Sequence, residues 1–160
     1  MGADNQQERL DPQWIAGFVD GEGCFFIGIN RQPAMSVGFQ VLPEFRIVQH
    51  RRDFDVLHLL RNFFEVGVVV RNHGDRYELR IRGMENLEKV IGFFEKYPLK
   101  TGKRYDFIAF RSVITMMRRK EHLTKDGLKR IRTIASGMNR QRRSDRESSE
   151  TSTSDTVPKR

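Results

Sequence analysis

The residues best suited to chemistry lie in one short stretch, residues 14–24, where an apolar run leads into Asp20 and Glu22 with Gly21 between them. Carboxylate oxygens are ligands that Mg²⁺ prefers in proteins, so the end of this stretch is a candidate metal site. A helix end followed by a turn, with both acids solvated, accounts for the same spacing equally well. The pattern alone therefore leaves a metal site and an ordinary turn open.

The same stretch predicts a helix that another backbone approaches closely. Asp11 can cap this helix, and Pro12 suits its first turn because the φ of proline is already helical. Gly17 and Gly21 lie on one face of the helix, and each glycine costs about 1 kcal/mol of helix propensity relative to alanine. A helical face without side chains indicates a close backbone contact.

Composition bounds the class of protein. The chain has 160 residues, and its 29 Lys and Arg against 21 Asp and Glu give a net charge of +8, which favours a nucleic acid as partner over a membrane surface. The single cysteine, Cys24, excludes an internal disulfide and a cysteine-based zinc cluster. The histidines show no ligand spacing, which disfavours a histidine-based metal nuclease; they are His50, His58, His73 and His122.

No apolar run reaches membrane-spanning length, and residues 1–10 resemble neither a signal peptide nor a transit peptide. We expect a soluble protein without a membrane partner, working in the compartment where it is made, either a bacterial or archaeal cytoplasm or an organelle. Length predicts one domain over residues 11–138, preceded by a flexible N-terminus over residues 1–10. Residues 139–160 lose their apolar positions and are predicted to form a disordered basic and polar tail.

Apolar periodicity predicts an α+β fold with the order αββαββα and extra C-terminal helices. Strands are predicted over residues 24–32, 37–49, 66–71 and 76–82, and helices over residues 53–64, 87–94 and 107–117. Thr124 is a candidate N-cap for a last helix. Pro43 predicts a bulge or an unpaired position in the second strand.

An antiparallel sheet buried under helices on one face leaves its other face open. Long polar side chains on that face can reach base edges in the major groove, with Arg suited to guanine and Gln or Asn to adenine. An exposed sheet is polar in any case, and the basic charge favours DNA. The predicted DNA-binding residues on this face are Asn30, Gln32, Gln40, Glu44, Arg46, Arg71, Arg76, Glu78, Arg80 and Arg82.

The nonamer Ile15-Ala16-Gly17-Phe18-Val19-Asp20-Gly21-Glu22-Gly23 resembles the LAGLIDADG motif of the homing endonucleases, with glycine in place of the motif's second alanine. Residues 45–50, 97–104 and 120–128 also look like segments of that family, and the resemblance covers roughly residues 12–139. The family fold is αββαββα with the motif helix first, which agrees with the order predicted from periodicity.

Family members carry two motifs in one chain or one motif in a homodimer, and this chain shows one motif. The resemblance therefore implies a homodimer whose motif helices cross at their glycines, and a long pseudo-palindromic DNA target. The predicted interface residues are Trp14, Ala16, Gly17, Phe18 and Gly21.

The resemblance also implies the site. Glu22 matches the family's metal-binding acid, usually Asp, with Gly21 beside it at a Mg²⁺ site, and Gln49 matches the polar residue that orients water. Lys103 matches the active-site basic residue, with Lys100 as the alternative. Arg51 and Arg52 lie near the position of another active-site base, and Asp20 is expected to be scaffolding at the helix end.

The implied activity is Mg²⁺-dependent, site-specific DNA cleavage that makes double-strand breaks in intron or intein homing. The alternative is a non-catalytic binder of the same fold, either an RNA maturase that binds its host intron RNA or a DNA-binding regulator.

Overall fold

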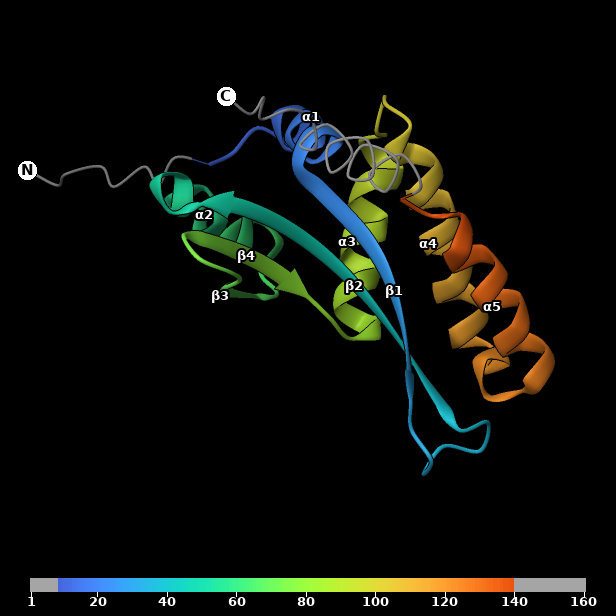
Figure 1. Ribbon diagram of the computed structural model, residues 1–160. Helices are drawn as coiled ribbons and strands as arrows, with labels where there is room; N and C mark the ends of the chain where they lie inside the picture. The colour runs from blue at the N-terminus through green and yellow to red at the C-terminus, as the bar shows by residue number, and fades with distance from the viewer. Residues whose placement is uncertain (1–8, 140–160) are drawn as a thin grey trace, which may run out of the picture.

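The computed structural model describes residues 9–139, and it has the predicted α+β architecture (Figure 1). The elements in chain order are α1 (Pro12–Glu22), β1 (Gly23–Arg31), β2 (Phe39–His50), η1 (Arg51–Asp53), α2 (Phe54–Phe64), β3 (Val68–Arg71), β4 (Arg76–Ile81), α3 (Met84–Lys96), α4 (Lys103–Arg118), η2 (Glu121–Leu123) and α5 (Lys125–Gly137). The N-terminal segment and the C-terminal tail predicted from composition fall largely on residues 1–8 and 140–160, which lie outside the described residues. None of the helices within residues 9–139 has the length and apolar character needed to cross a membrane.

Side-chain caps fix the start of the first and last helices. The Asp11 carboxylate accepts from the backbone N–H of Gln13 at 2.8 Å and of Trp14 at 3.0 Å, so α1 begins at Pro12 as predicted. The Thr124 hydroxyl accepts from the N–H of Gly127 at 3.0 Å and starts α5. Both caps satisfy donors that the first turn of a helix leaves without a partner.

The four strands form one antiparallel sheet in the order β1-β2-β4-β3. Helices α2 and α3 lie behind this sheet in Figure 1, and α4 packs beside them against β1, so the three helices cover one face of the sheet. An aromatic cluster fills the space between the two layers, with the fully buried Phe25 ring 5.1 Å from that of Phe45 and 5.3 Å from that of Phe110. This packing holds β1 and β2, which follow α1 directly, in a rigid frame.

Of the bulge or unpaired position predicted at Pro43, the structure has the unpaired position, on the β4 side. No bulge interrupts the β1–β2 register, which pairs Pro43 with Ile27. The pairing of β2 with β4 begins only at Phe45, opposite Ile81. Pro43 therefore lies beyond the end of β4, where β2 pairs on one side alone, and proline is tolerated at such a position.

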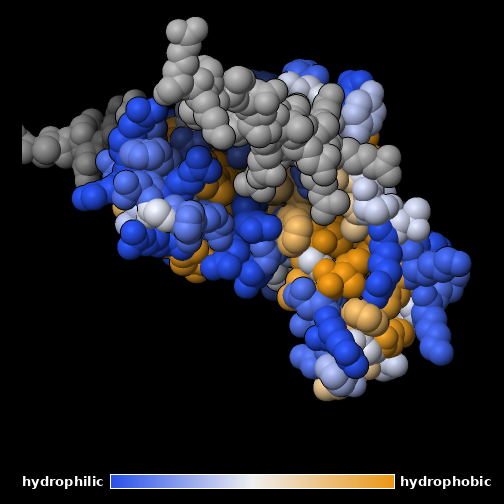
Figure 2. All heavy atoms as spheres, in the orientation of Figure 1, coloured by the Kyte–Doolittle hydropathy of each residue, from blue (hydrophilic) through white to orange (hydrophobic). Residues whose placement is uncertain are grey.

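The opposite face of the sheet carries the polar side chains of β2 and β4. Figure 2 shows that the surface over β2, β4 and β3 is mainly hydrophilic, whereas apolar atoms gather towards α5. The two faces of these strands follow the alternation expected of a half-covered antiparallel sheet.

Asp20 fixes the end of α1 to the loop between α3 and α4. Its carboxylate accepts from the backbone N–H of Lys100 at 2.7 Å, and from the N–H and the hydroxyl of Thr101 at 3.1 and 2.8 Å. Three donors from one loop occupy both carboxylate oxygens, so Asp20 serves as scaffolding.

Replacing Asp20 by Asn is expected to destabilise the fold by about 1–3 kcal/mol, because the new amide NH₂ would face N–H donors. Urea denaturation of the full chain measures this loss. The control is Asp53→Asn, since the Asp53 side chain is 52% exposed and pairs with the exposed Arg52 at 3.3 Å. That control should change stability by less than about 0.5 kcal/mol. Equal losses in the two variants would contradict the role given to Asp20.

Candidate active site and nucleic-acid interface

Glu22 is exposed at the last position of α1, where the chain turns directly into β1. It lines a surface hollow together with Gln49, which lies near the end of β2. The β1–β2 register creates this proximity by pairing Gly23 with Ile47, two residues from Gln49. The predicted acid and the predicted water-orienting residue therefore share one hollow.

Lys103 reaches the same end of α1. Its ammonium group donates to the backbone carbonyl of Val19 at 2.9 Å, one turn before Glu22. Lys100 is exposed, and its backbone N–H is bound to Asp20. These contacts favour Lys103 over Lys100 as the basic residue of the site.

The end of α1 favours a cation electrostatically. Backbone carbonyls in the last turn of a helix carry partial negative charge, and Gly21 lies in that turn. The last turn contains no basic residue, and Glu22 adds a full negative charge. Hard oxygen donors of this kind suit a divalent cation. Within residues 9–139, no three His, Cys, Asp or Glu side chains lie close enough to hold a metal ion together.

The hollow also contains residues that the sequence did not assign to the active site. His50 lies beside Gln49, while Asn72, His73 and Arg76 come from the hairpin between β3 and β4. The position of His50 next to Gln49 in the sequence could have indicated that His50 lies at this hollow. No local signal placed His73 or Arg76 at this hollow, because pairing of β2 with β4 brings them there from a distant part of the chain.

Arg51, Arg52 and His122 do not line the hollow that contains Glu22. Arg51 and Arg52 line a separate hollow with Phe54 and Tyr77. His122 lies in η2, and burial lowers its pKa below the ordinary value of 6.5.

The predicted contact face of α1 is exposed. An added Cβ at Gly17 or Gly21 would meet nothing within 4 Å. Trp14 is 45% exposed and stacks on Phe18 at 4.9 Å between ring centroids. These four residues form one helical stripe, called here the α1 stripe. Including Ala16 in the interface was wrong, because Ala16 is 4% exposed and faces the core of its own protomer.

The ten residues predicted to bind DNA divide into exposed, partly exposed and buried groups. Asn30, Gln32, Arg71, Arg76 and Arg82 are exposed, and Gln40, Arg46 and Arg80 are partly exposed. The expectation that Glu44 and Glu78 are displayed on the open face was wrong, since each is only 5% exposed. Glu44 lies 3.2 Å from Arg46 and Glu78 lies 3.5 Å from Arg80, so the arginines cover the carboxylates.

Solved structures with this fold are also similar to this chain in sequence. The crystal structure of the homing endonuclease I-TnaI is 57% identical, with a TM-score of 0.80, over 88% of this chain and 97% of that chain. The structure of I-LtrWI, a LAGLIDADG homing endonuclease bound to target DNA, is 32% identical, with a TM-score of 0.79, over 88% of this chain and 46% of that chain.

Proteins similar in sequence are named as endonucleases as well. The protein "Probable intron-encoded endonuclease 3" of Neurospora crassa is 32% identical over 137 residues, which are 84% of this chain. The chain spans about a quarter of the length of that relative, 26%. The family model described as LAGLIDADG endonuclease matches residues 15–114, which include most of α1, the whole sheet and most of α4. The chain therefore belongs to the LAGLIDADG endonuclease family.

Proposed function

We propose that this protein is a site-specific DNA endonuclease that makes double-strand breaks by metal-assisted phosphodiester hydrolysis. The observation that carries the proposal is the meeting of Glu22 and Gln49 in one hollow, with Lys103 bound to the same helix end. The polar sheet face beside this hollow offers a surface for duplex DNA, and the net charge of +8 favours a polyanion.

The proposed role of Glu22 is to hold a divalent cation, for which we propose Mg²⁺, with the Gly21 carbonyl as a second oxygen donor. A bound Mg²⁺ polarises a phosphoryl oxygen and lowers the pKa of a bound water. Gln49 can orient a water by hydrogen bonding, since its amide both donates and accepts. Lys103 supplies a positive charge near the scissile phosphate, where negative charge develops in the transition state.

Glu22→Gln should reduce DNA cleavage by roughly a thousandfold, because metal assistance contributes several kcal/mol and each 1.36 kcal/mol is a factor of ten. Affinity for the target in Ca²⁺ should change less than about threefold. The assay uses a duplex selected from a randomised plasmid library by the wild-type protein in Mg²⁺. Removing the metal with EDTA should abolish cleavage by the wild-type protein, and added Mg²⁺ should restore it.

The matched control is Glu85→Gln in the first turn of α3, which removes the same charge from an exposed position outside the hollow and should cut normally. Undiminished cutting by Glu22→Gln would exclude Glu22 as the metal-binding acid. Binding of the host intron RNA without any binding of DNA would instead favour the maturase.

We also propose that the active protein is a homodimer joined along the α1 stripe. The stripe exposes Trp14, stacked on the partly buried Phe18, beside two glycines with open space above them, which suits a second helix. Two-fold symmetry would bring a second Glu22 to the site, and one chain alone gathers no three metal-binding side chains within residues 9–139. Cutting two antiparallel strands requires two such sites, which a two-fold dimer provides.

Gly17→Leu tests this interface. A side chain at Gly17 meets nothing within 4 Å in the protomer, so the fold should tolerate it. In the dimer it would overpack the helix crossing at about 1–3 kcal/mol per copy, raising the dimer dissociation constant at least about thirtyfold. Analytical ultracentrifugation measures this against a protomer mass of 18.8 kDa.

Gly92→Leu is the control, because Gly92 is equally open but lies on α3. This variant should remain a dimer. A wild-type monomer at micromolar concentration, or an unchanged Gly17→Leu dimer, would contradict the proposed interface.

The relatives' names support an origin within an intron, since the N. crassa protein is named as intron-encoded. We therefore propose that the gene lies in an intron and that the protein acts in the compartment whose genome carries that intron.

A further inference from the structure

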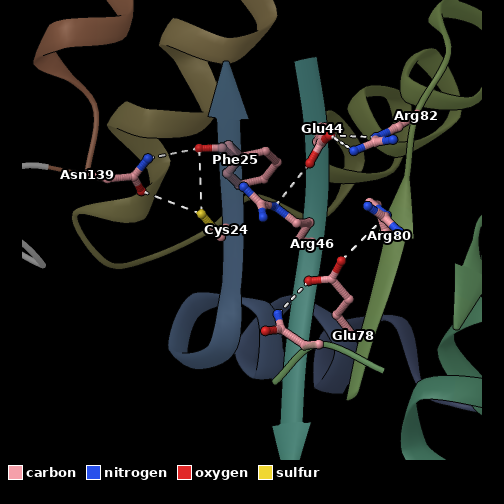
Figure 3. A network of polar contacts seen from close by, with 9 residues as sticks. Cys24, Phe25, Glu44, Arg46, Glu78, Arg80, Arg82 and Asn139 are labelled. Atoms are coloured by element: carbon pink, nitrogen blue, oxygen red, sulfur yellow. Dashed lines mark hydrogen bonds and ion pairs between the residues drawn. The ribbon is translucent and has the colours of Figure 1, made fainter. Parts of the chain in front are cut away.

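The same Glu-x-Arg pattern occurs twice on the open sheet face, with Glu44 and Arg46 in β2 and Glu78 and Arg80 in β4. The antiparallel register places Arg46 directly opposite Arg80. The two acids lie on opposite sides of this arginine pair (Figure 3). Glu78 pairs with Val48 on one side. On the other side, Glu44 precedes Phe45, the first β2 residue that pairs with β4.

Each carboxylate divides its oxygens between two partners. In Glu44, Oε2 lies 3.2 Å from Arg46 Nε, while Oε1 accepts from Nε and Nη2 of Arg82. In Glu78, Oε1 lies 3.5 Å from Arg80 Nε, while Oε2 accepts from Asn72 Nδ2 at 2.7 Å. A buried carboxylate is costly unless it is paired and hydrogen-bonded, and this arrangement satisfies both conditions.

The ion pairs of Glu44 with Arg46 and of Glu78 with Arg80 are formed at Nε of each arginine. Within the described part of the chain, no hydrogen bond engages the terminal Nη groups of either arginine. Arg46 is held further by Phe26, whose ring centroid lies 4.6 Å from the guanidinium carbon. Both arginine side chains are 29% exposed, so each remains partly open to solvent on this face.

Stability does not account for this pair of arginines. Like charges directly opposite each other in an antiparallel pair are destabilising. Replacing buried ion pairs by apolar side chains is often neutral or stabilising. The arrangement instead places two partly exposed guanidinium groups side by side on the open face, and guanidinium forks bind O6 and N7 of guanine in the major groove.

We propose that Glu44 and Glu78 are positioning residues that hold Arg46 and Arg80 as a paired reader of guanine in each half of the DNA target. This inference rests on the proposed function, because it assumes that duplex DNA binds the open sheet face. Arg82 then fixes the Glu44 carboxylate in place, since Nε and Nη2 of Arg82 both contact Oε1 of Glu44.

The test compares the full-length wild-type protein with Glu44→Gln and Glu78→Gln. Each protein selects bound duplexes from a randomised DNA library in Ca²⁺, and affinities are then measured for the selected duplex with single guanine-to-adenine changes. The wild-type protein should prefer guanine by about tenfold or more at two positions per half-site. Each variant should lose the preference at one of them, to below about threefold.

Affinity for random-sequence duplex should stay the same or rise in these variants, because each removes a negative charge from the DNA-facing surface. A general loss of structure would weaken both kinds of binding. The control is Glu95→Gln, which removes the same charge from an exposed ion pair with Arg111 and should leave the guanine preference intact.

Should Glu44→Gln or Glu78→Gln fail to fold, Arg82→Lys and Asn72→Ala loosen the same carboxylates and leave Glu44, Glu78, Arg46 and Arg80 in place. Loss of guanine preference at the corresponding positions supports the inference. Unchanged preference in all folded variants, or a selected motif without guanine at these positions, overturns it. Failure of the wild-type protein to select any duplex would overturn the proposed function itself.

Discussion

The geometry of the candidate site depends on the junction at the end of α1. Asp20 binds the loop before α4 through three hydrogen bonds, and the Lys103 ammonium binds the Val19 carbonyl in the same turn. These contacts place Glu22, Lys103 and the first residues of β1 relative to one another. The two acids of the motif thus have different roles, because Asp20 is committed to the loop while Glu22 remains exposed.

The two faces of the sheet also have different roles. One face is closed by an aromatic cluster around Phe25, which supplies the apolar burial that stabilises the fold. The other face keeps charged groups in a fixed arrangement, with Glu44 and Glu78 buried beneath arginines. A rigid core on one side makes it possible to hold polar side chains precisely enough on the other to recognise a base edge.

The α1 stripe connects the protomer to its proposed partner. Its glycines face open space, whereas the other side of the helix, including Ala16, is buried against the protomer's own core. The same short helix therefore has one face buried in the fold, one exposed face proposed to bind a second subunit, and a carboxylate end proposed to hold a metal ion.

The sequence by itself determined the element order, the cap at Asp11, the glycine face of α1 and the choice of Glu22 and Gln49, because periodicity, capping and a short motif are local signals. Only the tertiary structure decided which lysine reaches α1, that His73 and Arg76 join the hollow, and that Glu44 and Glu78 lie beneath arginines. Alternation assigns a residue to a face of a sheet, but its burial depends on neighbours from other strands. Those neighbours are set by register and packing, which no local pattern records.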